Sequence, residues 1–169
     1  MKSILKTGLV IGLSCMAWQL VMGLTGWYLH PVLLNLFWIV IVIQLGVMIW
    51  GLRMTAREGR EYGGQVGAGT LMAVSGGVII FFGSLLFTTV LFPHYFEDIR
   101  KVGEELLKAR GISDADIKTQ LDAQAAMQTP VFSALSGFIG TIVTGLLISL
   151  IAAAFIRKKT AAADATPGA

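Results

Sequence analysis

Four long apolar runs dominate this sequence of 169 residues. They cover about residues 4–29, 32–52, 67–92 and 131–156, and apart from Lys6 near the start of the first run they contain no Asp, Glu, Lys, Arg or His. About 20 apolar residues are enough for a helix to cross the ~30 Å hydrocarbon core of a bilayer. Because backbone groups in lipid must bond within their own segment, each run is expected to be helical. The sequence therefore predicts an all-α polytopic membrane protein with four transmembrane helices in a bundle.

The positions of the basic residues predict the orientation. Charged residues make up 14% of the chain, against about 25% in soluble domains. Basic residues gather at the N-terminus, between runs two and three, and after run four, whereas residues 93–130 carry more acidic than basic side chains. By the positive-inside rule, both termini are expected in the cytosol, and the chain is expected in a cytoplasmic (inner) membrane. The net charge of +3 is explained by this pattern, so no nucleic-acid partner is expected.

The segment between runs three and four is predicted to fold outside the membrane. Residues 94–127 show apolar positions at helical spacing, with Gly111 as a helix stop and Ser113 as an N-cap for a second helix. We expect an amphipathic helical hairpin over the outer mouth of the bundle. Residues 1–159 are then one four-span membrane domain, and residues 160–169, which are small and polar, are predicted to be a disordered cytosolic tail.

A row of small residues at four-residue spacing marks the fourth run. Small residues allow helix backbones to approach closely in lipid, where no hydrophobic force drives helices together. The row predicts a close helix contact, either within the bundle or in a homodimer. Its members are Ser133, Gly137, Thr141, Gly145, Ser149 and Ala153.

Two amides stand out within the apolar runs. Gln19 and Gln44 lie at similar distances from the turn at His30 and Pro31, so their depths differ by only about 3 Å at about 1.5 Å per residue. A hydrogen bond between them across the first helical pair is the structural interpretation. The alternative is a polar lining for a substrate path, for which Asn35 would be the third member.

No residue pattern indicates an enzyme, a metal or a cofactor. The sequence contains no GxSxG, HExxH or Walker motif. His94, Glu97 and Asp98 share one helix face and could bind a metal, but no second spacing supports a site. Cys15, the single cysteine, fits a small buried residue within a retained first helix. We therefore expect a protein without catalytic, cofactor-binding or metal-binding residues.

Several short features together resemble one known family. The basic N-terminus runs into Gly8 and Gly12, and the segment 111–117 is followed by Met127-Gln128-Thr129-Pro130. Glycines gather before the third run, and the fourth ends in a basic cluster: Gly63, Gly64, Gly67, Gly69 and Ile156-Arg157-Lys158-Lys159. In this order the chain resembles the bacterial membrane family called domain of unknown function 4199. The resemblance implies the four-span layout and carries no activity or site residues.

Two functions remain open at this point. The first is a non-enzymatic scaffold or accessory membrane component that uses the small-residue row and the outer hairpin as contact surfaces, with a second copy or another membrane protein as partner. The alternative is a carrier or channel for an uncharged or lipidic small molecule, because ion-coupled transport normally uses ionisable groups inside the membrane and the runs have none there. The lipid bilayer is a partner in both.

Overall fold

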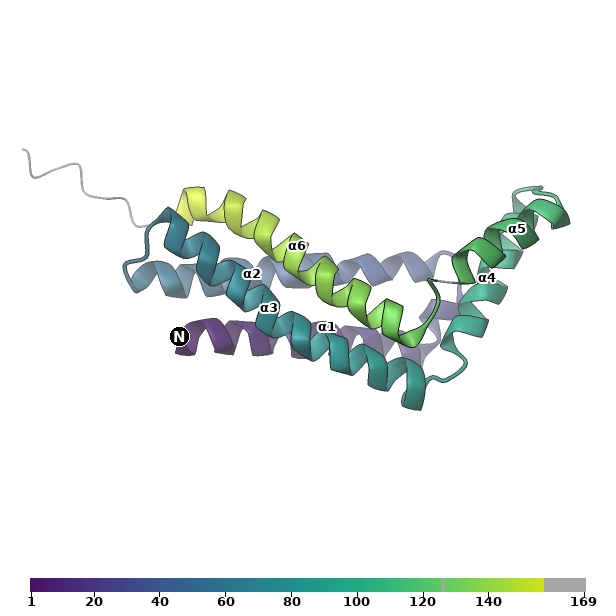
Figure 1. Cartoon of the computed structure of the whole chain (residues 1–169), viewed down its shortest axis with the longest axis horizontal. Helices are drawn as coiled ribbons and strands as arrows, with labels where there is room; N and C mark the ends of the chain where they lie inside the picture. The colour runs from purple at the N-terminus through teal and green to yellow at the C-terminus, as the bar shows by residue number, and fades with distance from the viewer. Residues whose placement is uncertain (126, 157–169) are drawn as a thin grey trace, which may run out of the picture.

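The computed structural model describes residues 1–125 and 127–156, which form helices joined by short turns (Figure 1). No strand occurs among these residues. The elements in chain order are α1 Lys2–Thr25, η1 Trp27–Leu29, η2 Leu33–Trp38, α2 Ile39–Arg57, α3 Tyr62–Leu86, η3 Phe87–Leu91, α4 Tyr95–Ala109, α5 Asp114–Ala125 and α6 Pro130–Ile156. The tail predicted over residues 160–169 lies outside the described residues.

Four helical stretches are long and apolar enough to cross a membrane, as the four runs predict. They are Lys2–Thr25, Leu33–Arg57, Tyr62–Leu91 and Pro130–Ile156. The boundaries differ from the predicted ones at several places, and the second stretch ends at Arg57 instead of residue 52 while the third begins at Tyr62 instead of residue 67. The first helix ends at Thr25 instead of residue 29, because Gly26 adopts a left-handed conformation with φ 69°. The second begins as the 3-10 helix η2, which has a longer rise per residue than an α-helix.

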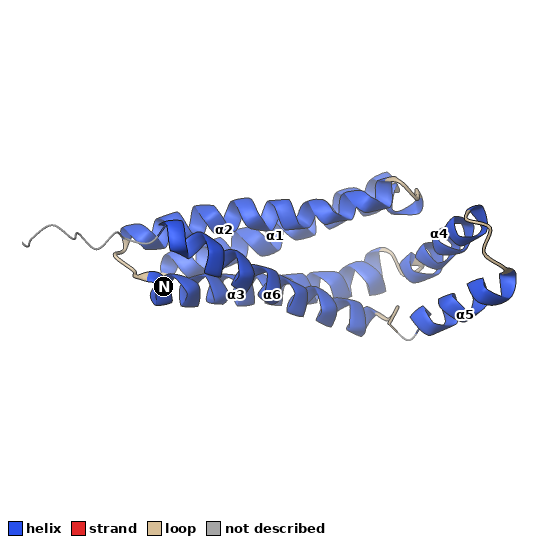
Figure 2. Ribbon diagram, turned by 90° about the horizontal axis from the view of Figure 1, so that it is seen from above, coloured by secondary structure: helices blue, strands red, loops and turns tan. Residues whose placement is uncertain are grey.

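The four long helices form an elongated bundle in which α3 has the most neighbours. It packs against α6 and α1, and the ring is closed by contacts of α2 with α1 and with α6. Figures 1 and 2 show that α1 and α3 run in the same direction although α2 separates them in the sequence. The second helix is the least covered: 11% of its apolar window is buried, against 28–39% for the other three.

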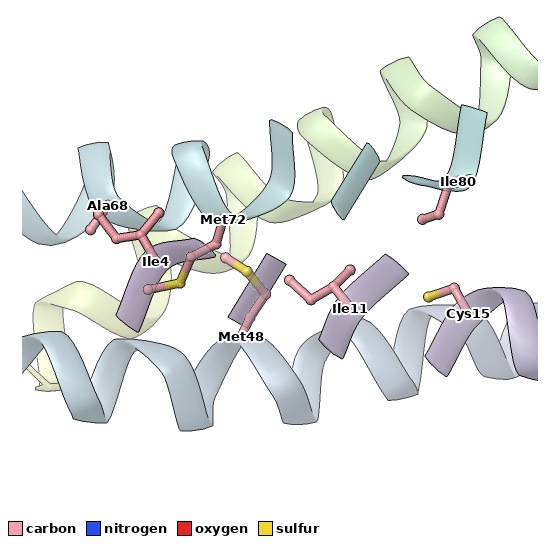
Figure 3. Packing of buried hydrophobic residues seen from close by; sticks show 7 residues of the cluster. All are labelled: Ile4, Ile11, Cys15, Met48, Ala68, Met72 and Ile80. Carbon is pink, nitrogen blue, oxygen red and sulfur yellow. The ribbon is translucent and has the colours of Figure 1, made fainter. Parts of the chain in front are cut away.

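The core lies between α1, α2 and α3 and combines sulfur-containing and branched side chains (Figure 3). Its buried residues are Ile4, Ile11, Cys15, Met48, Ala68, Met72 and Ile80. Glycines bring α1 and α3 together beside it. A side chain at Gly12 would overlap Ile79, and one at Gly76 would lie 2.9 Å from Ile11. This close approach explains why α1 and α3 can be direct neighbours.

The helices α4 and α5 pack against each other at one end of the bundle. The first ends at Ala109 with Arg110 as its C-cap and Gly111 at φ 74°, and Ile112 N donates to Leu107 O at 3.2 Å, which is a Schellman stop. Ser113 Oγ accepts a bond from Asp116 N at 3.3 Å and caps α5. These are the stop and the cap that the sequence predicts. The bundle's opposite end carries the N-terminus, the link from α2 to α3 and the end of α6 (Figure 1).

Candidate functional site

A cavity of about 460 Å³ lies in the half of the bundle next to α4. Its walls come from α1, α2, α3 and α6, and the start of α4 covers its end. Figure 2 shows the pair α1 and α2 diverging from the pair α3 and α6 toward this end. The volume falls in the range of about 300–1,000 Å³ that is common for small-molecule sites.

One hydrogen bond closes the inner end of the cavity. Gln44 Nε2 on α2 donates to Thr141 O on α6 at 2.7 Å, and both residues are buried. One turn further along α6, a side chain added to Gly145 would overlap Ala73 on α3. At Gly69 an added side chain would overlap Ser149. The inner half of the bundle is therefore tightly packed, and the cavity ends at the level of Gln44.

Most Ser and Thr hydroxyls around the cavity lack the bonds that hydroxyls make elsewhere in these helices; Thr141, which donates to Gly137 O at 2.8 Å, is the exception among the described lining residues. Most Ser and Thr side chains donate to a carbonyl three or four residues earlier, as Thr88 does to Ser84 O at 2.9 Å and Ser149 does to Gly145 O at 2.6 Å. In the described part of the four long helices, five make no side-chain hydrogen bond, and all but Ser14 line the cavity: Ser14, Ser84, Ser133, Ser136 and Thr144. Polar groups free to bind a ligand are thus concentrated on the cavity wall.

The predicted amide pair is not joined by a hydrogen bond. Gln19 is half-buried and lines the cavity together with Gln44, but Gln44 uses its amide nitrogen on Thr141 O. Gln19 makes no side-chain hydrogen bond among the described residues. Asn35, the third member of the alternative polar lining, bonds back to Val32 O at 3.2 Å and does not line the cavity. The two amides share a cavity instead of pairing.

The small-residue row of α6 divides into two parts. Thr141, Gly145, Ser149 and Ala153 are buried, and the overlaps at Gly145 and Gly69 place this part against α3 within the chain. Ser133 and Gly137 are half-buried and line the cavity. Between the two alternatives for the row, the structure assigns its inner part to packing within the bundle.

An aromatic cluster lies where α3 gives way to α4. The chain passes through the π-turn η3, and the rings of Phe87 and Phe92 lie 4.5 Å apart, with Tyr95 5.5 Å from Phe87. Burial raises the pKa of the Tyr95 phenol above its ordinary value. Tyr95 and Phe96 also line the cavity, so α4 contributes two aromatic side chains to this end.

The three residues weighed as a metal site do not converge. His94 Nδ1 lies 3.3 Å from Glu97 Oε2 on the exposed surface. Asp98 Oδ2 instead accepts a bond from Tyr28 at 3.2 Å, which links η1 to α4. No group of three or more His, Cys, Asp or Glu suited to a metal ion occurs in residues 1–125 and 127–156.

Sequence reasoning missed part of the cavity wall. Ser84, Tyr95 and Phe96 line it, yet each looks like an ordinary residue of an apolar or amphipathic helix. Cys15 was expected to be buried in packing, and it also reaches the cavity. A signal was available for Ser136 and Gly140, because they widen the small-residue row of α6 toward one side.

These features define an all-helical protein with four helices compatible with a multi-pass membrane protein. Residues 6–158 match the family described as protein of unknown function (DUF4199). The chain belongs to this family, as its resemblance to domain of unknown function 4199 predicted. No curated protein and no solved structure matches the chain.

Proposed function

We propose that this chain is a membrane-embedded carrier that takes up an uncharged, lipidic small molecule into the cavity between α2 and α6. One observation carries the proposal: the cavity has free polar groups on its inner wall and no charged residue among those that line it. Gln44 and Ser84, each at least nine-tenths buried, give it fixed hydrogen-bonding positions. Ligand sites of this kind are mostly apolar, with a few polar groups that set orientation.

The exposed residues at the rim fit entry from the bilayer. Trp38 at the end of η2, Ile41 on α2 and Phe132 on α6 line the cavity and are exposed. In a membrane these side chains would face acyl chains, so a lipidic molecule could enter between α2 and α6 without crossing water. The hydrogen bond from Gln44 to Thr141 O then separates the cavity from the opposite half of the bundle. We propose that the chain lies in the cytoplasmic membrane with its termini inside, which puts the cavity in the outer half.

The scaffold hypothesis relied on two contact surfaces, the small-residue row of α6 and the α4–α5 pair, and only part of these surfaces is exposed. Gly145 and Ser149, at the centre of the small-residue row, are covered by α3. What remains as a contact surface is the α4–α5 pair, whose exposed faces carry charges such as Lys101 and Glu105. The carrier proposal uses the interior of the bundle, so a test that fills the cavity distinguishes the two.

A photoreactive lipid tests the proposal. The protein is reconstituted in liposomes with a diazirine analogue of monooleoylglycerol, irradiated and digested, and labelled peptides are identified by mass spectrometry. Labelling is expected on the cavity segments of α2 and α6. Gly140→Leu should reduce it at least fivefold, because Gly140 lines the cavity and a side chain added there has nothing within 4 Å to disturb.

Gly46→Leu is the matched control. Gly46 lies on the exposed side of α2, outside the cavity lining, and a side chain there also has nothing within 4 Å. It should leave both cavity labelling and the movement of a fluorescent monoacylglycerol between leaflets unchanged, whereas Gly140→Leu lowers both. Equal labelling in Gly140→Leu and wild type would reject the cavity as the binding site and favour a scaffold.

A further inference from the structure

We infer that the molecule held in the cavity is an uncharged lipid whose head group carries free hydroxyl groups. This inference rests on the proposed function and adds the chemical class of the ligand. It is carried by three properties of the cavity: the absence of charge among its described lining residues, the unpartnered polar atoms on its inner wall, and the apolar rim between α2 and α6.

The lining excludes an ionised head group. No Asp, Glu, Lys, Arg or His is among the described residues that line the cavity. Asp98, on α4 near the covered end, is held by Tyr28 and by Lys101, 3.8 Å away. A phosphate or carboxylate inside the cavity would lose water without gaining a counter-charge, which strongly disfavours its binding. Phospholipids and fatty acid anions are therefore poor ligands.

The Gln44 amide oxygen requires a ligand group that donates. Gln44 is 5% exposed, and its Oε1 accepts no hydrogen bond, since only the amide nitrogen of Gln44 is bonded. Amide oxygens only accept, whereas a hydroxyl donates and accepts. A ligand hydroxyl can therefore donate to Gln44 Oε1, which an ether or ester oxygen cannot do. Ser84, which is 6% exposed and lies further along α3 toward α4, makes no side-chain hydrogen bond among the described residues and can donate to another oxygen of the ligand.

The rim provides a place for an acyl chain. Trp38 is 63% exposed, and Ile41 and Phe132 are exposed to about 40%. These exposed residues line the cavity from two sides: Trp38 and Ile41 come from η2 and α2, and Phe132 comes from α6. A cavity of about 460 Å³ holds a glycerol-sized head group and the first part of one chain. The rest of the chain then continues into the surrounding lipid, so the ligand is a lipid rather than a free polyol.

Competition against the photoreactive monoacylglycerol tests the inference on the whole protein. Three unlabelled lipids with the same oleoyl chain are compared: monooleoylglycerol, its dimethyl ether, and a phosphatidylglycerol. Monooleoylglycerol should suppress labelling of the cavity peptides at about tenfold lower mole fraction than the other two. The comparison of the glycerol with its dimethyl ether changes only the hydroxyls and needs no variant of the protein.

A matched pair of glutamines adds the protein side of the test. Gln44→Leu removes the accepting amide oxygen and should abolish most of the preference for monooleoylglycerol over its dimethyl ether. Gln65→Met removes a buried amide outside the cavity lining and should leave the preference intact. Thermal unfolding of both variants identifies any loss of folded protein.

The possible outcomes separate the two proposals. Equal competition by the dimethyl ether, with labelling still confined to the cavity and blocked by Gly140→Leu, overturns the hydroxyl inference and leaves the carrier proposal in place. Strongest competition by the phosphatidylglycerol overturns the uncharged class. Absence of labelling in the cavity by any lipid overturns the proposed function itself.

Discussion

Gln44 and Thr141 are joined across the bundle by a hydrogen bond of 2.7 Å from a side-chain amide to a main-chain oxygen. The bond links α2 to α6, two helices that diverge toward the end of the bundle that carries α4 (Figure 2). Thr141 O lies at a point where the cavity ends and close packing begins. A single polar contact thus fixes how far the two helices stay together before they diverge.

Replacing Gln44 should weaken the bundle more than replacing Gln19. Gln44→Leu removes the bond to Thr141 O and is expected to lower the free energy of unfolding by about 0.6 to 2 kcal/mol. Gln19→Leu removes an amide with no hydrogen bond among the described residues and should cost less. In a detergent-unfolding series the two changes should be additive to within about 0.5 kcal/mol. Strong coupling between them would mean that the amides pair directly.

Gly145 should tolerate no side chain, not even a methyl group. An added Cβ would overlap Ala73 and come within 3.3 Å of Gln44 Nε2. Gly145→Ala is therefore expected to destabilise the folded monomer by about 1–3 kcal/mol, and Gly145→Leu by more. Adding Ala73→Gly should restore most of the loss in Gly145→Ala. Thermal unfolding measures each step.

Gly140→Ala and Leu146→Phe are the controls for that series, because a side chain at Gly140 meets nothing within 4 Å and Leu146 is exposed. Both should remain near wild type. Unchanged stability of Gly145→Leu would show that α6 does not pack on α3 through this row.

Near the other end of the bundle, replacing the buried amide of Gln65 should destabilise the protein less than replacing the hydroxyl of its hydrogen-bond partner Thr55. Thr55 Oγ1 donates to Gln65 Oε1 at 2.6 Å, and Gln65 Nε2 is buried without a hydrogen-bond partner. Thr55→Val leaves the whole amide unpaired and should cost about 1–3 kcal/mol. Gln65→Met removes the unpaired groups with little change in length and should cost less, as measured by unfolding in detergent. The reverse order of the two variants would contradict this account.

Stability should fall at alkaline pH because of Tyr95. Burial raises the pKa of this phenol above its ordinary value of 10.0. The folded state therefore keeps the proton at a pH where the unfolded state loses it, so the free energy of unfolding is level below about pH 10 and decreases above it. Tyr95→Phe should reduce the slope in unfolding curves measured between pH 9 and 11. Tyr62→Phe, a change at an exposed tyrosine, should leave this slope unchanged.

The proposed orientation predicts which positions an impermeant thiol reagent can reach. In a Cys15→Ser background, a cysteine at Arg57 should be shielded in intact cells and one at Lys108 should react. Arg57 ends α2 and Lys108 lies in the last turn of α4, and these two segments are at opposite ends of the bundle (Figure 1). Labelling of the first without lysis would reverse the orientation derived from the basic residues.

The elements of this fold were predictable where a local signal decides them. The length and apolarity of each run fix the four long helices, and Gly111 and Ser113 act within one turn of their own positions. Close packing around Gly145 was also predictable, because small residues at four-residue spacing have one structural use in apolar surroundings. Only the structure identifies Ala73 as the residue that packs against Gly145.

The site was less predictable because it depends on contacts that leave no trace in the sequence. The depth comparison of Gln19 and Gln44 assumed two straight α-helices, whereas η1 and η2 alter the rise per residue around the turn. The partner of Gln44 is a carbonyl oxygen, which every residue possesses. The cavity itself arises from the divergence of two helical pairs, so Ser84 becomes part of its wall only through tertiary geometry.

The parallel placement of α1 beside α3 has a consequence for biosynthesis. The contact between α1 and α3 can form as soon as α3 is made. The walls that α2 and α6 contribute to the cavity face each other only after α6 emerges from the ribosome. Until then Ala73 lacks its cover, and Gln44 lacks the oxygen of Thr141. The cavity is thus completed in one late step, and a nascent chain that stalls before residue 130 exposes an unpaired amide that the finished protein conceals.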